Sequence, residues 1–226
     1  MSPEQFKQRI LFEDKFLLIV DKPAGIAVEK ISPQIITLED LVYSHLLLTA
    51  KKPFVGIVHR LDRPTSGIIL FAKKPSVLKI MNAQFEKRIV RKYYVALVDG
   101  EVPNPSGSLK DYLHKDFLQK KAIISKQKSQ ANQEVKLNFS KIGLVGHRTL
   151  LKIELMTGKY HQIRAQLASI GFPIAGDVLY GGKLWKREGI GLHASALHFN
   201  HPETKERITI KSDWILILSQ SERTFQ

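Results

Sequence analysis

The most distinctive stretch of the chain is His59-Arg60-Leu61-Asp62-Arg63-Pro64-Thr65-Ser66-Gly67. An apolar run precedes it, Phe54 to Val58, and a second apolar run follows it, Ile68 to Ala72. Proline and glycine between two apolar runs predict a turn that joins two buried segments. This turn places a single carboxylate, Asp62, between two arginines and close to a histidine.

Two interpretations of Asp62 follow from these neighbours. A nearby opposite charge favours the ionised form of a carboxyl group, so Asp62 could act as a nucleophile or a base. In the alternative, Asp62 only forms salt bridges and caps the Thr65-Ser66-Gly67 turn, which is the commoner role of an aspartate in a turn. Other parts of the chain are needed to choose between them.

The composition indicates a globular protein with an anionic partner. The chain has 226 residues, of which 43% are hydrophobic, enough for a substantial core. Its formal net charge of +14 indicates nucleic acid first and an anionic membrane surface second. Residues 51–93 contain eleven Lys and Arg against two Asp and Glu, and residues 110–148 contain nine against three. The positive charge therefore surrounds Asp62 and recurs in the middle of the chain.

Cysteine is absent from the chain. Disulfides, thiolate zinc sites and cysteine nucleophiles are thereby excluded, and a reducing cytosol is the expected compartment. Residues 1–10 are polar and do not resemble a signal peptide, and no apolar run is long enough to span a membrane. We therefore expect a cytoplasmic protein that does not associate with membranes.

Several apolar runs have the length and composition of strands. Residues 16–20 and 26–28 predict two strands, separated by the tight turn Lys22-Pro23-Ala24-Gly25, on which Lys22 is expected to be solvated. Residues 102–108 predict a loop. The other expected strands lie at 93–98, 121–125, 135–139 and 149–155, followed by apolar runs at 192–199, 208–210 and 214–218.

Two helices are expected in the first half of the chain. Thr37 and Asp40 have the spacing of a capping box and predict a helix over 38–48. Pro75 begins the second helix. The expected core stripe of that helix consists of Leu78, Met81, Phe85 and Ile89.

Two later residues are candidates for a pocket. Alternation places Tyr93 and Tyr94 on opposite faces of their strand, so one of them can reach a pocket. Thr157-Gly158 opens a helix that Gly171 closes, and Arg164 lies off its apolar stripe. Arg164 is therefore either a surface residue or one that projects into a site. The stripe consists of Ile163, Leu167 and Ile170.

The chain contains only weak signals for a cofactor or a metal. The Gly-rich segment 172–182 lacks the spacing of a phosphate-binding loop or a dinucleotide fingerprint. His198 and His201 could bind a metal, but neither a carboxylate nor a third histidine completes a known spacing. We expect neither a cofactor nor a metal.

Four motifs occur in a fixed order along the chain. They are Lys22-Pro23-Ala24-Gly25; His59-Arg60-Leu61-Asp62 with Thr65-Ser66-Gly67; Lys92-Tyr93-Tyr94-Val95-Ala96; and Thr157-Gly158-Lys159-Tyr160-His161-Gln162-Ile163-Arg164, with Gly171-Phe172-Pro173-Ile174-Ala175-Gly176-Asp177. Over about residues 10–215 the chain resembles the RluA-type family of RNA pseudouridine synthases. The His-Arg-Leu-Asp element with its Thr-Ser-Gly tail is highly specific to that family.

The resemblance implies roles for these residues. Asp62 would be the catalytic residue, Tyr94 would line the uridine pocket and Arg164 would pair with the catalytic carboxylate. Arg60 would engage the surroundings of a flipped-out nucleotide. The remaining residues expected to contact the substrate or its RNA are His59, Arg63, Thr65, Lys22, Lys159 and His161.

The resemblance also implies a fold and a partner. We expect a mixed α+β fold in a single domain over residues 1–226, built around a bent, mainly antiparallel sheet with flanking helices. The partner would be transfer RNA or large-subunit ribosomal RNA, bound by a monomer. Many relatives carry a small N-terminal RNA-binding domain that is not expected here, so the basic surface of the catalytic domain would recognise the RNA.

Two positions depart from the family pattern. Lys159 stands where the family usually has arginine, and Gln166 stands where it usually has histidine. Lysine lacks the two-pronged guanidinium and glutamine cannot titrate, so these departures affect the expected RNA contacts more than the chemistry.

Two other classes of function compete with this one. A basic RNA-binding or ribosome-assembly module would need no catalysis. A glycoside or nucleoside hydrolase would need a second catalytic carboxylate, for which Asp177 is the candidate.

Overall fold

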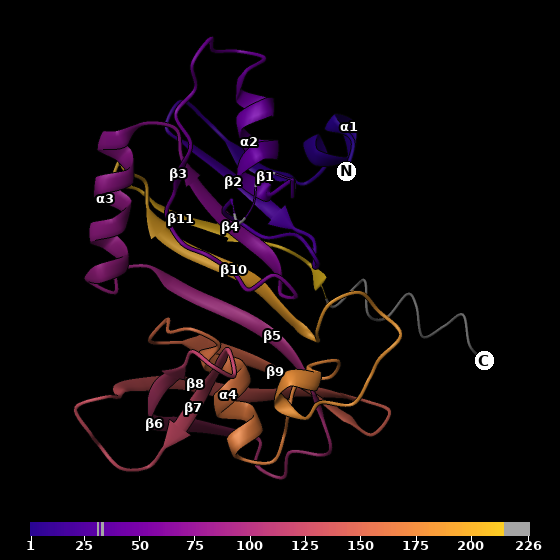
Figure 1. The fold of residues 1–226 in the computed structure, drawn as a ribbon. Helices are drawn as coiled ribbons and strands as arrows, with labels where there is room; N and C mark the ends of the chain where they lie inside the picture. The colour runs from indigo at the N-terminus through magenta and orange to yellow at the C-terminus, as the bar shows by residue number, and fades with distance from the viewer. Residues whose placement is uncertain (31, 33, 215–226) are drawn as a thin grey trace. The chain divides into compact units, whose positions relative to one another are not determined.

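The structure is a computed structural model that describes residues 1–30, 32 and 34–214. It combines a few helices with mainly antiparallel strands (Figure 1). The expected mixed α+β class is therefore confirmed. The chain divides into two compact units, unit 1 with residues 1–90 and 193–226 and unit 2 with residues 91–192. Organisation as a single domain stays a prediction, and residues 215–218 of the last expected apolar run lie outside the described residues.

Within its described residues, unit 1 combines a small sheet with the helices α1, α2 and α3. Its elements are α1 (Pro3–Lys7), β1 (Ile10–Glu13), β2 (Leu17–Lys22), α2 (Leu38–Leu46), β3 (Gly56–Ile57), β4 (Ser66–Ala72), α3 (Pro75–Glu86), β10 (Leu192–Asn200) and β11 (Arg207–Lys211). The strands are ordered β1-β2-β4-β10-β11, and β3 also pairs with β4. The ladder between β4 and β10 is parallel, whereas the other ladders are antiparallel. The strand that directly follows the Asp62 turn, β4, therefore lies in the middle of this sheet.

The core of unit 1 explains the apolar run after the Asp62 turn. Every residue from Ile68 to Ala72 is buried, because β4 has neighbours on both sides and apolar side chains on both faces. Helix α3 packs on this strand through Val77 and Met81. The expected stripe of α3 is only partly correct, since Ile89 lies beyond the helix and is exposed.

The capping box at the start of α2 is confirmed. The hydroxyl of Thr37 accepts the N–H of Asp40, and the Asp40 carboxylate accepts the N–H of Thr37. The strand expected over 26–28 is wrong. The carbonyls of Ala27 and Val28 instead accept the first two N–H groups of α2, which a helix cannot pair internally.

Unit 2 is an antiparallel sheet with one α-helix. Its elements are β5 (Arg91–Asp99), β6 (Ser106–Asp116), β7 (Lys121–Ser125), β8 (Gln133–Val145), β9 (Arg148–Leu155), α4 (Gln162–Ser169) and the 3-10 turn η1 (Val178–Tyr180). The strand order is β5-β9-β8-β6-β7. The loop expected over 102–108 is partly wrong, since β6 begins at Ser106. The start of β6 is polar and mostly exposed, so it carries no apolar signal.

Helix α4 begins later than expected. His161 adopts the left-handed conformation with φ of 51°, so the regular helix starts only at Gln162. The hydroxyl of Thr157 donates to the side chain of Gln162 and ties the preceding loop to the helix. Gly171 has φ of 87° and ends the segment as expected.

Candidate active site

The Asp62 turn lies in unit 1 and is fixed by its backbone. The N–H of Thr65 donates to the carbonyl of Asp62 at 3.0 Å, which closes the turn. Arg63 makes two contacts with the 22–25 turn, because its carbonyl accepts the N–H of Gly25 at 2.9 Å and its Nε donates to the Gly25 carbonyl at 2.7 Å. The first two motifs are therefore bound directly to each other. The side chain of Asp62, in the second motif, is half-buried.

The side chain of Lys22 links these two motifs through hydrogen bonds to their backbone. Its side chain is fully buried, and Nζ donates to the carbonyls of Pro23, Ile26 and Arg63 at 3.0, 2.8 and 3.1 Å. The interpretation of Lys22 as a solvated lysine is therefore wrong. Its expected contact with RNA has no support in this geometry, since the ammonium binds backbone carbonyls inside the protein.

Position 67 has to be glycine because strand β10 packs closely against it. It has φ of 112°, and a Cβ at this position would lie 2.4 Å from the carbonyl oxygen of Ala194 on β10. The neighbouring Ser66 shares a hydrogen bond of 2.9 Å with Nδ1 of His193 on the same strand. The Thr-Ser-Gly tail therefore anchors the turn to β10.

Thr65 carries an unusual buried hydroxyl. Its side chain is 2% exposed, and its Oγ1 has no hydrogen-bond partner among the residues that the structure describes. A buried polar atom without a partner costs free energy and is often explained by a ligand or an ordered water. The position directly after the Asp62 turn makes this hydroxyl a candidate for a substrate contact.

His59 and Arg60 point in different directions. Nε2 of His59 accepts the N–H of Leu70, and its ring stacks on Phe85 with 5.0 Å between centroids. The ring of His59 therefore contacts both β4 and α3. Arg60 is exposed and forms an ion pair with Glu29.

Tyr94 lies in unit 2, on the buried face of β5. It is 7% exposed and sits opposite Ile153 of β9. Tyr93 lies on the other face, where its hydroxyl donates to Glu154 at 3.3 Å. The expected alternation of the two tyrosines is therefore confirmed.

Arg164 is held by a buried carboxylate of the same unit. Nε and Nη2 donate to the two oxygens of Asp177 at 2.6 and 2.9 Å, and the guanidinium lies 5.1 Å from the ring centre of Tyr180. Arg164 is 4% exposed and Asp177 is 2% exposed. The alternative of a surface arginine is therefore wrong. A two-point pair of this kind fixes the plane of the guanidinium.

Gln166 and Lys159, the two departures from the family pattern, lie in different environments. Gln166 is fully buried, and its amide nitrogen donates to Asp111 at 2.7 Å while its oxygen accepts from Gln162. Its partners therefore lie inside unit 2. Lys159 is exposed and precedes His161, whose ring is half-buried.

Lys92, which is half-buried, and His193, which is buried, are two ionisable residues to which the sequence analysis assigned no role. Burial lowers the pKa of Lys92 to about 8, and a Cβ at Gly158 would lie 2.6 Å from its Nζ. Lys92 shares a face of β5 with Tyr94, as strand alternation alone could have indicated. Burial also lowers the pKa of His193 to about 4, outweighing a hydrogen bond to Ser212 that raises it.

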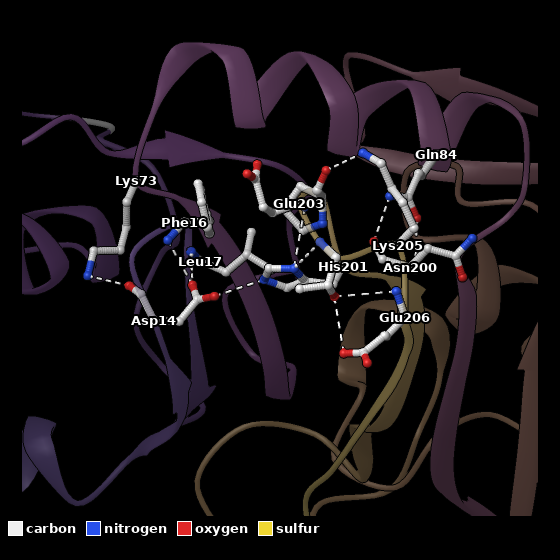
Figure 2. Close-up of polar contacts among 12 residues, drawn as sticks. Asp14, Phe16, Leu17, Lys73, Gln84, Asn200, His201, Glu203, Lys205 and Glu206 are labelled. Carbon is white, nitrogen blue, oxygen red and sulfur yellow. Dashed lines mark hydrogen bonds and ion pairs between the residues drawn. The ribbon is translucent and has the colours of Figure 1, made fainter.

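His201, a possible metal ligand from its spacing to His198, has a structural role. Its Nδ1 accepts the N–H groups of Glu203 and Thr204, and its Nε2 lies 2.8 Å from Asp14 (Figure 2). Asp14 also accepts the N–H of Leu17, so His201 ties the end of β10 to the start of β2. Within the described part of the chain, no group of three or more His, Asp or Glu side chains is placed to hold a metal ion.

The expected site residues are thus shared between the two units. Asp62 belongs to unit 1, whereas Tyr94 and Arg164 belong to unit 2. Joint action of these three side chains on one substrate stays a prediction. Over residues 1–30, 32 and 34–214, no helix is long and apolar enough to cross a membrane.

Comparison with known proteins identifies the family. The model of the family described as RNA pseudouridylate synthase matches residues 16–169. The chain therefore belongs to the RNA pseudouridylate synthase family, whose members are isomerases that act on RNA, and the expected resemblance is confirmed.

Curated relatives cover most of the chain. It is 34% identical over 228 residues to an uncharacterized RNA pseudouridine synthase, YhcT, of Bacillus subtilis, covering 99% of this chain and 74% of the relative. It is 32% identical to tRNA pseudouridine synthase C of Haemophilus ducreyi, covering 93% and 94%. It is 35% identical to the ribosomal large subunit pseudouridine synthase C of the same species, covering 91% of this chain but only 65% of that one.

A solved structure supports the fold. The human protein named RNA Pseudouridylate Synthase Domain Containing 4 is similar with a TM-score of 0.79, over 98% of this chain and 95% of that one. The sequence identity is 20%, so this likeness concerns the fold alone.

Proposed function

We propose that this chain isomerises specific uridines in RNA to pseudouridine, with Asp62 as the catalytic group. The observation that carries the proposal is the construction of the Asp62 turn. Its backbone is fixed by Lys22 and Arg63, and it lies beside the buried hydroxyl of Thr65, which has no partner among the described residues. A rigid turn of this kind is suited to hold a carboxylate in one position against a substrate.

The reaction explains why a carboxylate is needed. The N1–C1′ bond of uridine breaks, the uracil turns while it remains bound, and C5 joins C1′. Cleavage builds positive charge on the sugar, as in glycoside hydrolysis, and an anion beneath the sugar stabilises that charge. In this reaction Asp62 would either add to C1′ or remove a neighbouring proton.

Two residues of unit 2 would complete the site. Tyr94 would stack on the uracil and could move a proton at C5. Arg164 would keep Asp62 ionised and oriented. Its pair with Asp177 supports this role, because that pair fixes the guanidinium before substrate binds.

RNA would reach the site by base flipping. Extrusion of the target costs a few kcal/mol, roughly, and phosphate contacts with Lys and Arg offset that cost. Candidates for such contacts are the exposed Arg60, Arg63 and Lys159. Relatives named for ribosomal and transfer RNA make both RNAs plausible substrates. We expect a cytoplasmic monomer that uses no cofactor.

The test is the substitution Asp62→Asn. RNA labelled with tritium at C5 of uridine releases the label when C5 joins C1′. We expect Asp62→Asn to abolish release while RNA binding stays near that of the wild type. The exposed Asp213→Asn is the control and should release tritium normally. Appreciable release by Asp62→Asn would contradict the assignment.

The competing classes make different predictions. A hydrolase would release free uracil, and Asp177 would have to act as its second carboxylate. Asp177 is already bound at two points by Arg164, which argues against that role. An RNA-binding module without catalysis predicts no difference in pseudouridine content between RNA from cells with and without the protein.

A further inference from the structure

Unit 2 presents a row of aromatic and cationic side chains that leads from the turn between β6 and β7 to the start of α4. Its outer part, which we call the hairpin platform, consists of Lys115, Phe117, Leu118, Tyr160 and His161. None of the four motifs includes the first three of these residues, which lie in the basic segment 110–148.

The tip of the platform is apolar and exposed. Phe117 is 75% exposed and Leu118 is 97% exposed. The turn that carries them is well defined, since the carboxylate of Asp116 accepts the N–H of Gln119 at 2.9 Å. An ordered turn therefore presents two adjacent apolar side chains to solvent, where a ligand can reach them.

Contacts join this tip to the loop before α4. Nζ of Lys115 lies 4.7 Å from the ring centre of Phe117 and 4.5 Å from that of Tyr160. The hydroxyl of Tyr160 donates to the carbonyl of Lys120 at 3.1 Å, which ties the loop to the turn. The ring of Tyr160 also stacks on His161, with centroids 3.8 Å apart and planes 17° apart.

The inner end of the row reaches Arg164. Nδ1 of His161 lies 3.1 Å from the hydroxyl of Tyr180, which also accepts the N–H of Ala122. Burial raises the pKa of Tyr180 to about 12, so the phenol keeps its proton and can donate it to His161. The ring of Tyr180 packs on Arg164. The row is therefore continuous from solvent to the arginine assigned to the active site.

We propose that the hairpin platform binds unpaired nucleotides that flank the target uridine. This proposal rests on the proposed function. Residues 110–148 carry nine Lys and Arg against three Asp and Glu, so this segment suits an anionic partner such as the phosphates of RNA. Aromatic rings interleaved with lysines are the arrangement that stacks bases and holds the backbone of single-stranded RNA. The exposed ring of Phe117 is the stacking surface, because the ring of Tyr160 is already in contact with His161 and Lys115. Bases within a continuous helix cannot stack on Phe117, so the preferred RNA has an open loop.

The experiment compares binding of two probes to the full chain. The probes are a fluorescein-labelled 12-nucleotide oligouridylate and an RNA duplex of the same length, measured by anisotropy. Stacking contributes about 1–3 kcal/mol per base, so the double variant Phe117→Ala, Leu118→Ala should bind oligouridylate about tenfold more weakly. Its binding to the duplex should change by less than about twofold, because a duplex is held through phosphates.

Two further variants separate stacking from general effects. Leu144→Ala is the matched control. It removes an exposed apolar side chain near the end of β8, in another part of unit 2, and should leave both affinities unchanged. Lys115→Gln should weaken oligouridylate binding and lower its salt dependence by about one phosphate contact. Unchanged oligouridylate binding in the double variant, or an equal loss in Leu144→Ala, would overturn the proposal. An equal loss for both probes would overturn it too.

The binding test is independent of catalysis. Suppose that the double variant loses oligouridylate binding while the wild type releases no tritium from any RNA. Binding of unpaired nucleotides by the hairpin platform is then supported, and the proposed function is contradicted. If the double variant binds normally while Asp62→Asn abolishes tritium release, the proposed function stands and the platform fails.

Discussion

Ser66 and His193 are joined by a hydrogen bond of 2.9 Å although 127 residues separate them in the sequence. The imidazole of His193 is 2% exposed, and its second nitrogen lies 2.9 Å from the hydroxyl of Ser212. The ring also stacks on Trp214. A neutral histidine, with one nitrogen donating and the other accepting, therefore links the strand after the Asp62 turn to the end of the described chain.

This histidine should make the folded state sensitive to acid. Burial lowers its pKa to about 4 in the folded protein, against 6.5 for an exposed histidine. The unfolded chain therefore binds a proton that the folded chain does not between these pH values. Stability should fall by about 2 kcal/mol from this group between pH 7 and pH 5.

The measurement is urea unfolding of the wild type and His193→Asn at both pH values. The variant keeps a hydrogen-bonding side chain but cannot titrate, so its loss of stability on acidification should be smaller by about that 2 kcal/mol. Other acidic groups contribute equally to both proteins and cancel in the comparison. Identical losses would show that His193 does not titrate in this way.

Removal of the buried ammonium should loosen the Asp62 turn. Lys22→Met leaves the carbonyls of Pro23, Ile26 and Arg63 without their shared donor. We expect a loss of at least about 3 kcal/mol in the free energy of unfolding, because several buried acceptors lose a partner together. Lys51→Met, at an exposed lysine, is the control and should change stability little. Equal stability of the two variants in urea would contradict this role of Lys22.

The pair formed by Arg164 and Asp177 should be strongly coupled. Asp177→Asn removes the carboxylate that Arg164 meets at two points, and loss of one partner of a buried ion pair typically costs about 3–5 kcal/mol. The double variant Arg164→Met, Asp177→Asn should lose less than the sum of the two single variants. A double-mutant cycle in urea measures this coupling, and additive losses would mean that the pair contributes no mutual stabilisation.

The same substitution should have very different effects at two glycines. Gly67→Ala should destabilise the protein by about 3 kcal/mol or more, because its positive φ and the Ala194 backbone exclude a Cβ. Gly143→Ala meets no atom within 4 Å and should change stability by less than about 0.5 kcal/mol. Thermal unfolding of the two variants checks this, and a tolerated Gly67→Ala would refute the close approach of β4 and β10.

Local signals predicted local structure well. The capping box of Thr37 and Asp40 involves atoms three residues apart, so its outcome hardly depends on the rest of the fold. The alternation of Tyr93 and Tyr94 was correct for the same reason. The stripe expected for α3 was only partly correct, because the side of the helix that is buried depends on which strand the helix meets. There Gln84 takes a core position by pairing with the backbone of Asn200.

The sequence by itself determined the family, the position of the Asp62 turn and the basic character of the surface, because these follow from residue types and short spacings. Only the tertiary structure decided the partners of the polar side chains around that turn. The ammonium of Lys22 donates a hydrogen bond to the carbonyl of Arg63, 41 positions further along the chain. The guanidinium of Arg164 pairs with the carboxylate of Asp177, which lies outside its helix. Such contacts depend on which distant segments fold against each other. A lysine or arginine that looks solvated in the sequence can therefore be the centre of a buried network in the fold.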